Sequence, residues 1–235
     1  PDLDGLTAVL ADTLTGATDP SIAQALSETE PGADDPGLAA ALEWMTATTG
    51  AGADEASSWY PPTLVDDRLI AAEGDMARFV TEATGGLNVA LRSPVVRIAH
   101  DDDGVSLQLG TGESLAFDRV IVTVPLGVLQ HGGLDFSPAL PDSHQRAIDE
   151  IAVGSIETIW LRFDEPFWRE DAAIWHLVDP DAVIRTWINL QPSTGEPILV
   201  GLVGGAAATE FAALDDGDAE IVALTSLEAV LTASA

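Results

Sequence analysis

Residues 88–124 hold a run of short apolar stretches separated by turns, and this pattern restricts the fold more than any other feature of the sequence. Residues 105–109 alternate between apolar and polar with a period of two. Turn-forming residues precede this stretch at Asp101–Gly104 and follow it at Thr111–Gly112. Further apolar stretches occupy 88–91, 95–99, 115–117 and 119–124, the last resembling a buried strand. Short strands joined by tight turns predict an antiparallel β-meander.

Helical periodicity precedes this meander, and a mixture of strands and helices follows it. Apolar spacing predicts helices within residues 1–14, from Leu38 to Met45 with Pro36 near the start, and from Asp75 to Ala83. After Pro138 we expect helices at 142–151, 206–213 and 218–232, and strands at 155–163, 173–178, 183–190 and 198–203. The predicted fold class is therefore α/β, more specifically α+β, with a mixed β-sheet flanked by helices.

The charge balance excludes several classes of partner. The chain has 39 acidic residues against nine basic ones, all arginine, for a net charge of −30. Nucleic acids and anionic membranes would be repelled. The sequence has no cysteine, which removes disulfides and thiolate sites, and its four histidines show no metal-like spacing, so no metal is predicted. No apolar run reaches membrane-spanning length and no signal peptide is visible near Pro1, so a cytoplasmic location is expected.

Several motifs resemble the flavin-dependent (FAD) amine oxidases, the family of polyamine, monoamine and histone-demethylating oxidases. Residues 119–129 (RVIVTVPLGVL) are similar to a strand and turn that in this family ends beside the flavin. Four more segments resemble the family in the same order along the chain: 91–98 (LRSPVVRI), 134–141 (LDFSPALP), 161–168 (LRFDEPFW) and 198–205 (ILVGLVGG). The resemblance implies FAD as cofactor, with contacts at Val95, Thr123, Val124, Pro125 and Leu126.

The resemblance also exposes two departures from the family. No Gly-x-Gly-x-x-Gly turn follows a strand, so the N-terminal Rossmann part is expected to be missing and this chain alone is not expected to retain FAD. The family commonly carries a lysine, which holds a water near flavin N5, at the position of Thr158. Thr158 is therefore the candidate catalytic residue, with a hydroxyl that can bind water but no cation.

By the same resemblance, residues 1–63 are assigned to a helical part of a substrate domain, 64–130 to a segment of the FAD-binding domain, and 131–235 to the substrate-binding domain. Trp160, Trp175 and Trp187 are candidates for the wall of a substrate cavity, since aromatic faces attract cations; core packing is the competing role. The parent protein is expected to oxidise a small amine, polyamine-like or primary, at a CH–NH or CH–NH₂ bond. A cofactor-free scaffold or interaction module is one alternative, and a flavin desaturase or protoporphyrinogen-type oxidase is another. The sequence leaves the oligomeric state open.

Overall fold

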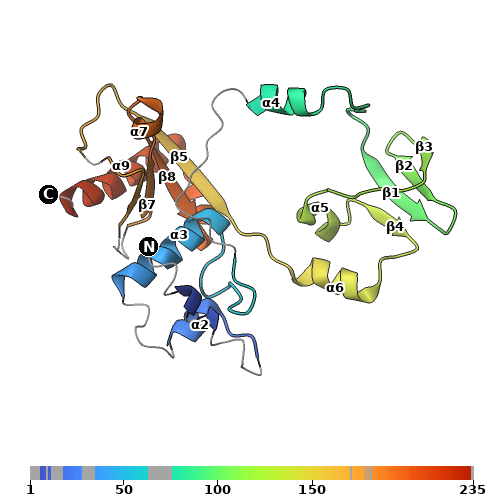
Figure 1. The fold of residues 1–235 in the computed structure, drawn as a ribbon, viewed down its shortest axis with the longest axis horizontal. Coiled ribbons are helices and arrows are strands. Elements are labelled where there is room, and N and C mark those ends of the chain that lie inside the picture. Colours follow the sequence, from blue (N-terminus) through green and yellow to red (C-terminus); the bar gives the residue numbers. More distant parts are fainter. Residues whose placement is uncertain are drawn as a thin grey trace. The chain divides into compact units, whose positions relative to one another are not determined.

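The chain forms two compact units (Figure 1). The structure, a computed structural model, describes residues 6–8, 10–11, 18–27, 35–62, 76–169, 171–177, 179 and 182–233. One unit consists of Pro1–Val65 and Gly154–Ala235 and is called the sheet unit below. The other consists of Asp66–Val153 and is called the meander unit. The domain boundaries expected from the resemblance lie after residues 63 and 130, whereas the meander unit continues to Val153. The roles assigned to those domains stay a prediction.

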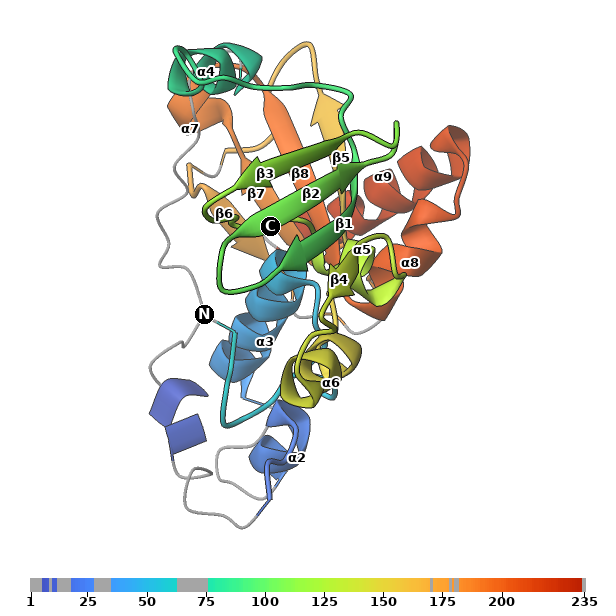
Figure 2. The same cartoon turned by 90° about the vertical axis from the view of Figure 1, so that its right-hand side faces the viewer.

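The meander unit contains the predicted β-meander. Its strands are β1 (Val95–His100), β2 (Val105–Leu109), β3 (Ser114–Phe117) and β4 (Asp135–Ser137). They form one sheet in the order β3-β2-β1-β4, and Figure 2 shows the four side by side. The pairs β1–β2 and β2–β3 are antiparallel, as predicted, while β4 runs parallel to β1 and was not predicted as a strand. In the tight turn between β1 and β2, the Asp101 carboxylate accepts hydrogen bonds from the backbone N–H groups of Asp103 and Gly104.

Three helices complete the described part of this unit, and the first and third begin close to where the sequence predicted them. They are α4 (Met76–Ala83), α5 (Leu126–Gln130) and α6 (Asp142–Glu150). Pro125 precedes α5 and Pro141 precedes α6, both with backbone angles outside the helical region. The Gln130 side chain donates hydrogen bonds to the carbonyls of Ile148 and Ile151, which ties α5 to the end of α6.

Two predicted strands are absent from the meander unit. Residues 119–124 form irregular backbone that joins no sheet, and residues 88–91 form irregular backbone and a turn. Ile121 is 88% exposed, so the prediction of a buried strand at 119–124 was wrong for this structure. An apolar run of this kind can form a strand, but a strand needs a hydrogen-bonded neighbour, and none of the described residues supplies one.

The sheet unit is built on a second four-stranded sheet, in the order β5-β8-β7-β6. Its strands are β5 (Ile156–Arg162), β6 (Ile174–His176), β7 (Thr186–Asn189) and β8 (Ile198–Gly204), and all neighbours are antiparallel. A short helix, α7 (Gln191–Thr194), joins β7 to β8. The sheet and the helices around it confirm the predicted α/β class.

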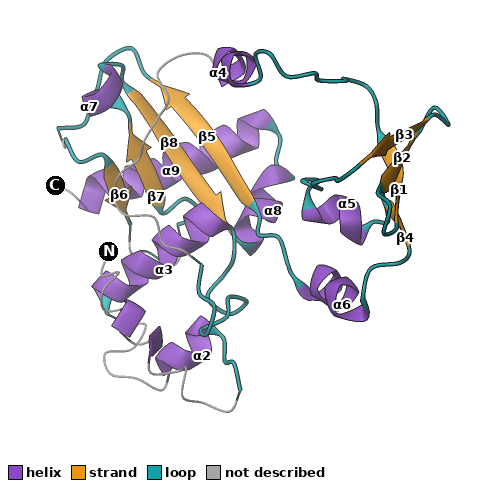
Figure 3. Cartoon of the chain, turned by 45° about the vertical axis from the view of Figure 1, so that its right-hand side comes forward, coloured by secondary structure: helices purple, strands orange, loops and turns teal. Residues whose placement is uncertain are grey.

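Helices cover the two faces of this sheet differently (Figure 3). On one face, side chains of α8 (Ala206–Ala212) and α9 (Asp216–Ala233) join a hydrophobic core with the sheet. That core includes Trp187, Leu199 and Val203 from the strands and Phe211 and Leu227 from the helices. On the other face lies α3 (Pro36–Thr49), which packs chiefly against β8.

Helix α3 illustrates how the sequence specifies its own ends. The Asp35 carboxylate caps the helix by accepting hydrogen bonds from the backbone N–H groups of Gly37 and Leu38, at 2.9 and 3.0 Å. Pro36 occupies the first turn, where a missing N–H costs nothing. Gly50 ends the helix at φ 74°, a left-handed conformation that glycine adopts without strain. The helix predicted around Leu38–Met45 is confirmed and continues to Thr49.

A small helical layer precedes α3 in the sheet unit. Helix α2 (Ile22–Ser27) and the helical residues 6–8 and 10–11 contribute to a second apolar cluster with α3. The rest of the helix predicted within residues 1–14 lies outside the described residues. Among the helices of the described chain, none combines the length and apolar character that crossing a bilayer requires.

Candidate functional site

Strand β5 carries Thr158 and Trp160 on the same side. Side chains two residues apart in a strand share a face, so Ile156, Thr158, Trp160 and Arg162 form one row, called the open β5 face below. Thr158 is exposed, and Trp160 is 63% exposed, which is unusual for so large an apolar side chain. Glu157, one residue before Thr158, points to the opposite face. Two of the predicted site residues are thus brought together and accessible.

The other two predicted cavity tryptophans lie on the opposite face. Cross-strand pairing places four residues in one row across the sheet: Trp175, Trp187, Gly201 and Ile159. This row faces α8 and α9. Trp187 has no exposed surface, and Trp175 retains 8% and donates its indole N–H to the Ala172 carbonyl at 2.9 Å. The structure therefore places Trp175 and Trp187 in the hydrophobic core, apart from Trp160.

Two ion pairs lie near the ends of the sheet. The Arg162 guanidinium, on the open β5 face, contacts the Glu196 carboxylate at 2.7 Å in an exposed setting. The Arg185 guanidinium contacts the Glu43 carboxylate of α3 at 2.7 Å, with both side chains about two-thirds or more removed from solvent. Burial raises the pKa of the Glu43 carboxyl above its usual value, and the positive charge of Arg185 partly opposes that rise. The second pair anchors α3 to the chain entering β7.

The five candidate cofactor contacts all lie in the meander unit. Val95 is half-buried at the start of β1, where the register with β2 is interrupted by a bulge. Thr123 and Val124, at the end of segment 119–124, and the following Pro125 are exposed, and Leu126 begins α5. Accessible apolar side chains and one hydroxyl suit the edge of a flavin or an adenine. They do not suit its pyrophosphate, because α5 has only five residues and no glycine-rich turn precedes it.

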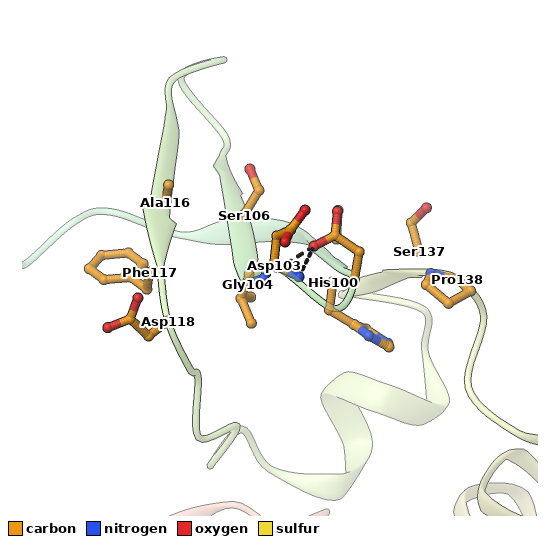
Figure 4. Close-up of a pocket in the computed structure, with 12 residues that line it drawn as sticks. His100, Asp103, Gly104, Ser106, Ala116, Phe117, Asp118, Ser137 and Pro138 are labelled. Atoms are coloured by element: carbon orange, nitrogen blue, oxygen red, sulfur yellow. Dashed lines mark hydrogen bonds between the residues drawn. The ribbon is translucent and has the colours of Figure 1, made fainter.

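A hollow lies elsewhere in the described part of the meander unit (Figure 4). It has a volume of about 600 Å³ and lies beside the turn between β1 and β2. His100, Asp103, Phe117, Asp118 and Pro138 are among its lining residues, and none of the predicted site residues is. Within the described residues, no group of three or more His, Asp or Glu side chains is arranged to hold a metal ion.

Two features of these surfaces were not predicted from the sequence. Arg162 was not considered, although its position two residues after Trp160 places it on the same face of a strand. The separation of Trp160 from Trp175 and Trp187 depends on how β5, β8, β7 and β6 align, and no local pattern encodes that register.

Comparisons with known proteins give a consistent result. The family model for flavin containing amine oxidoreductases matches residues 54–234, which spans most of both units. Polyamine oxidase 4 of Oryza sativa subsp. japonica is 32% identical over 146 residues, covering 62% of this chain and 30% of that protein. Human lysine-specific histone demethylase 2 is 32% identical over 138 residues, covering 56% of this chain and 17% of that protein. The chain thus spans less than a third of the length of these relatives.

Solved structures share the fold over nearly the whole chain. A redesigned putrescine oxidase matches with a TM-score of 0.74 at 19% identity, covering 97% of this chain and 56% of that one. Cyclohexylamine oxidase from Brevibacterium oxydans matches with a TM-score of 0.69 at 20% identity, covering 96% and 55%. The motifs, the two sheets and the family match agree, and the chain belongs to the family of flavin-containing amine oxidoreductases.

Proposed function

We propose that this chain is the central part of an FAD-dependent amine oxidase, an enzyme that oxidises a small amine to an imine and yields peroxide. The observation that supports this most is the family match over residues 54–234, which includes both β5 and the segment leading into α5. When bound, FAD would accept a hydride equivalent from the carbon that carries the amine and pass electrons to oxygen. The protein's own contribution would be binding, orientation and the local electric field.

The cofactor contacts we propose are Val95 and the residues from Thr123 to Leu126. The exposed apolar run before α5 supports this assignment, because it presents side chains and unpaired backbone groups that a nucleotide and a neighbouring strand could both cover. The pyrophosphate would need a cradle that this sequence does not carry. Residues 1–235 alone are therefore expected to bind FAD weakly.

The substrate contacts we propose are Thr158 and Trp160 on the open β5 face. The Thr158 hydroxyl can donate one hydrogen bond and accept others, which suits it to hold a water molecule. Trp160 offers an exposed indole face, and such faces attract ammonium groups by about 0.5–1 kcal/mol at exposed sites. Trp175 and Trp187 would support the sheet from its other side without touching the substrate.

The test uses the protein expressed from its complete coding sequence. We expect the purified protein to show the absorbance of oxidised flavin, to lose it when an amine is added without oxygen, and to produce peroxide when oxygen is present. Bound flavin that no primary or secondary amine reduces would refute the amine oxidase function.

A cofactor-free scaffold is the second candidate. Two observations favour it: a neutral Thr158 occupies the lysine position, and the apolar segment 119–124 is exposed, as an interaction surface would be. The same absorbance measurement separates the two functions, because a scaffold would contain no flavin even after purification with added FAD.

A further inference from the structure

The open β5 face belongs to a larger face of the sheet, and the described strand residues on that larger face include no acidic side chain. Cross-strand pairing extends it from Thr158 to Leu202 and Thr186, and from Trp160 to Val200 and Ile188. The described strand positions on this face are Ile156, Thr158, Trp160, Arg162, Ile174, His176, Thr186, Ile188, Ile198, Val200, Leu202 and Gly204. None of these strand residues is Asp or Glu, although the chain has 39 acidic residues.

Helix α3 covers only one end of this face. It packs against the end that holds Gly204 and His176, where the Trp44 ring meets the His176 ring edge-on with centroids 5.7 Å apart. Thr158, Trp160 and Arg162 lie along the edge strand and remain exposed. The uncovered part of the face is thus a hydroxyl, an indole and aliphatic side chains, with one cation at its end.

The carboxylate that pairs with that cation does not make the surface attractive to a positively charged substrate. The Arg162 guanidinium is neutralised by Glu196, whose carboxylate it contacts at 2.7 Å, so this carboxylate is already engaged. The large negative charge of the rest of the molecule attracts a doubly charged amine more strongly than a singly charged one, but salt screens this attraction beyond a Debye length of about 8 Å at physiological ionic strength. Selection between amines must therefore come from the side chains that touch them.

A diamine or polyamine brings a second ammonium group, whose removal from water is costly without a carboxylate or several hydrogen-bond acceptors. The open β5 face offers neither. In a monoamine, the part of the molecule beyond its single ammonium group is apolar. That part requires only aliphatic and aromatic contact, which this face supplies through Ile156 and Trp160. The second charge is consequently the feature that the surface discriminates against.

We propose that the substrate is a monoamine with an apolar body, and that Trp160 determines this specificity by contacting that body. The inference rests on the proposed function, since it requires the open β5 face to line the substrate site. The inference narrows the expected substrates, which were polyamine-like or primary amines, to amines with one ammonium group.

The experiment compares two amines of equal chain length, hexylamine and 1,6-diaminohexane, with the flavin-loaded protein. Flavin reduction under anaerobic conditions gives kcat/KM for each without depending on oxygen. We expect hexylamine to be favoured by about tenfold or more. Equal or better use of the diamine would overturn the specificity and leave the amine oxidase function intact, whereas a flavin that neither amine reduces would overturn both.

Two variants connect the specificity to the named side chain. Trp160→Glu places a carboxylate on the open β5 face and should shift the ratio of kcat/KM values toward the diamine by about tenfold. Glu157→Gln, on the opposite face of the same strand, is the matched control and should leave the ratio unchanged. If Trp160→Glu does not fold, Trp160→Leu provides the test: KM for hexylamine should rise while kcat stays within about twofold. An unchanged ratio in a folded Trp160→Glu protein, or an unchanged KM in Trp160→Leu, would exclude Trp160 as the determinant.

Discussion

At the scale of single residues, Thr158 is the position where the resemblance to the family makes the most specific statement about the reaction. It lies in the middle of β5, is exposed, and has Trp160 beside it on the same face. The strand would accept a lysine there without steric conflict, because the side chain would extend away from the sheet. The neutral residue is therefore a difference in chemistry and not a requirement of packing.

We expect Thr158→Lys to accelerate the reoxidation of reduced flavin by oxygen. A cation near the reacting edge of the flavin would stabilise the negative charge that develops on oxygen, and about 1.4 kcal/mol of such stabilisation is tenfold in rate. The measurement is stopped-flow mixing of the reduced protein with oxygenated buffer. Thr158→Ala, the control, should not accelerate the reaction. Equal rates in all three proteins would mean that position 158 does not face the flavin.

Glu43 gives a pH-dependent prediction at the same scale. Burial raises the pKa of its carboxyl in the folded state above the usual value of 4.5, and Arg185 opposes the rise only in part. The folded state therefore holds this proton more tightly than the unfolded state. The resulting stabilisation is fully present below the unfolded pKa and is lost as pH rises through the folded pKa.

Glu43→Gln removes this titration. We expect the free energy of unfolding of the natural protein, minus that of the variant, to fall as pH rises from about the usual glutamate value through the raised pKa, and then to become constant. Urea unfolding at half-unit pH steps measures it. Arg185→Met removes the opposing charge, so in that background the fall should extend to higher pH. A difference that does not vary with pH would contradict the prediction.

At the scale of elements, the crossing of α3 over β8 depends on a missing side chain. A Cβ built on Gly204 would overlap the carbonyl group of Thr46 in α3, which is backbone and cannot rotate away. The close approach also buries Trp44 and Met45 of the helix almost completely. Glycine at position 204 therefore sets the distance between helix and sheet.

We expect Gly204→Ala to lower the free energy of unfolding by about 1–3 kcal/mol, the usual cost of overpacking. Gly217→Ala is the control, because position 217 lies in α9 and a Cβ there would approach only the Asp215 side chain, at 3.5 Å. This control should be neutral or stabilising by up to about 1 kcal/mol. Urea unfolding compares the two, and equal effects would show that the α3–β8 contact adjusts freely.

The same elements show what the sequence could and could not predict. Asp35, Pro36 and Gly50 encode the ends of α3 locally, and the alternation in β2 encodes a strand, so these elements were predicted. The face to which Trp160 points relative to Trp187 depends on pairing across four strands, which only the folded sheet determines. Residues 119–124 have the composition of a buried strand. Whether they pair and become buried depends on a neighbouring strand, which their own sequence does not specify.

At the scale of the whole molecule, the two units differ in how much apolar surface they bury. In the sheet unit, an extended core joins the strands to α8 and α9. In the described part of the meander unit, the buried apolar side chains are Ile98, Leu109 and Leu134. Many large apolar residues there remain exposed, including Phe79, Leu91 and Ile121. Most of the hydrophobic stabilisation of the described chain thus comes from the sheet unit.

Charge acts on the molecule as a whole and opposes its compactness. The net charge is −30, and the sequence contains nine arginines and no lysine to offset 39 acidic groups. Of the ion pairs in the described residues, Arg78–Glu82 and Arg162–Glu196 are exposed and contribute little. Folding brings the negative charges closer together than they are in the unfolded chain, so their mutual repulsion destabilises the folded state.

Salt should therefore stabilise this protein. Raising NaCl from about 0.01 to 1 M shortens the Debye length from about 30 to about 3 Å and removes most of the repulsion. We expect the thermal unfolding midpoint to rise by roughly 5 °C or more, since each kcal/mol corresponds to about 2–4 °C for a chain of this size. The triple variant Asp164→Asn, Glu165→Gln, Glu220→Gln should have a higher midpoint at low salt and a smaller rise. A midpoint that falls with added NaCl would contradict this account, because it would mean that attraction within ion pairs outweighs the repulsion among the unpaired carboxylates.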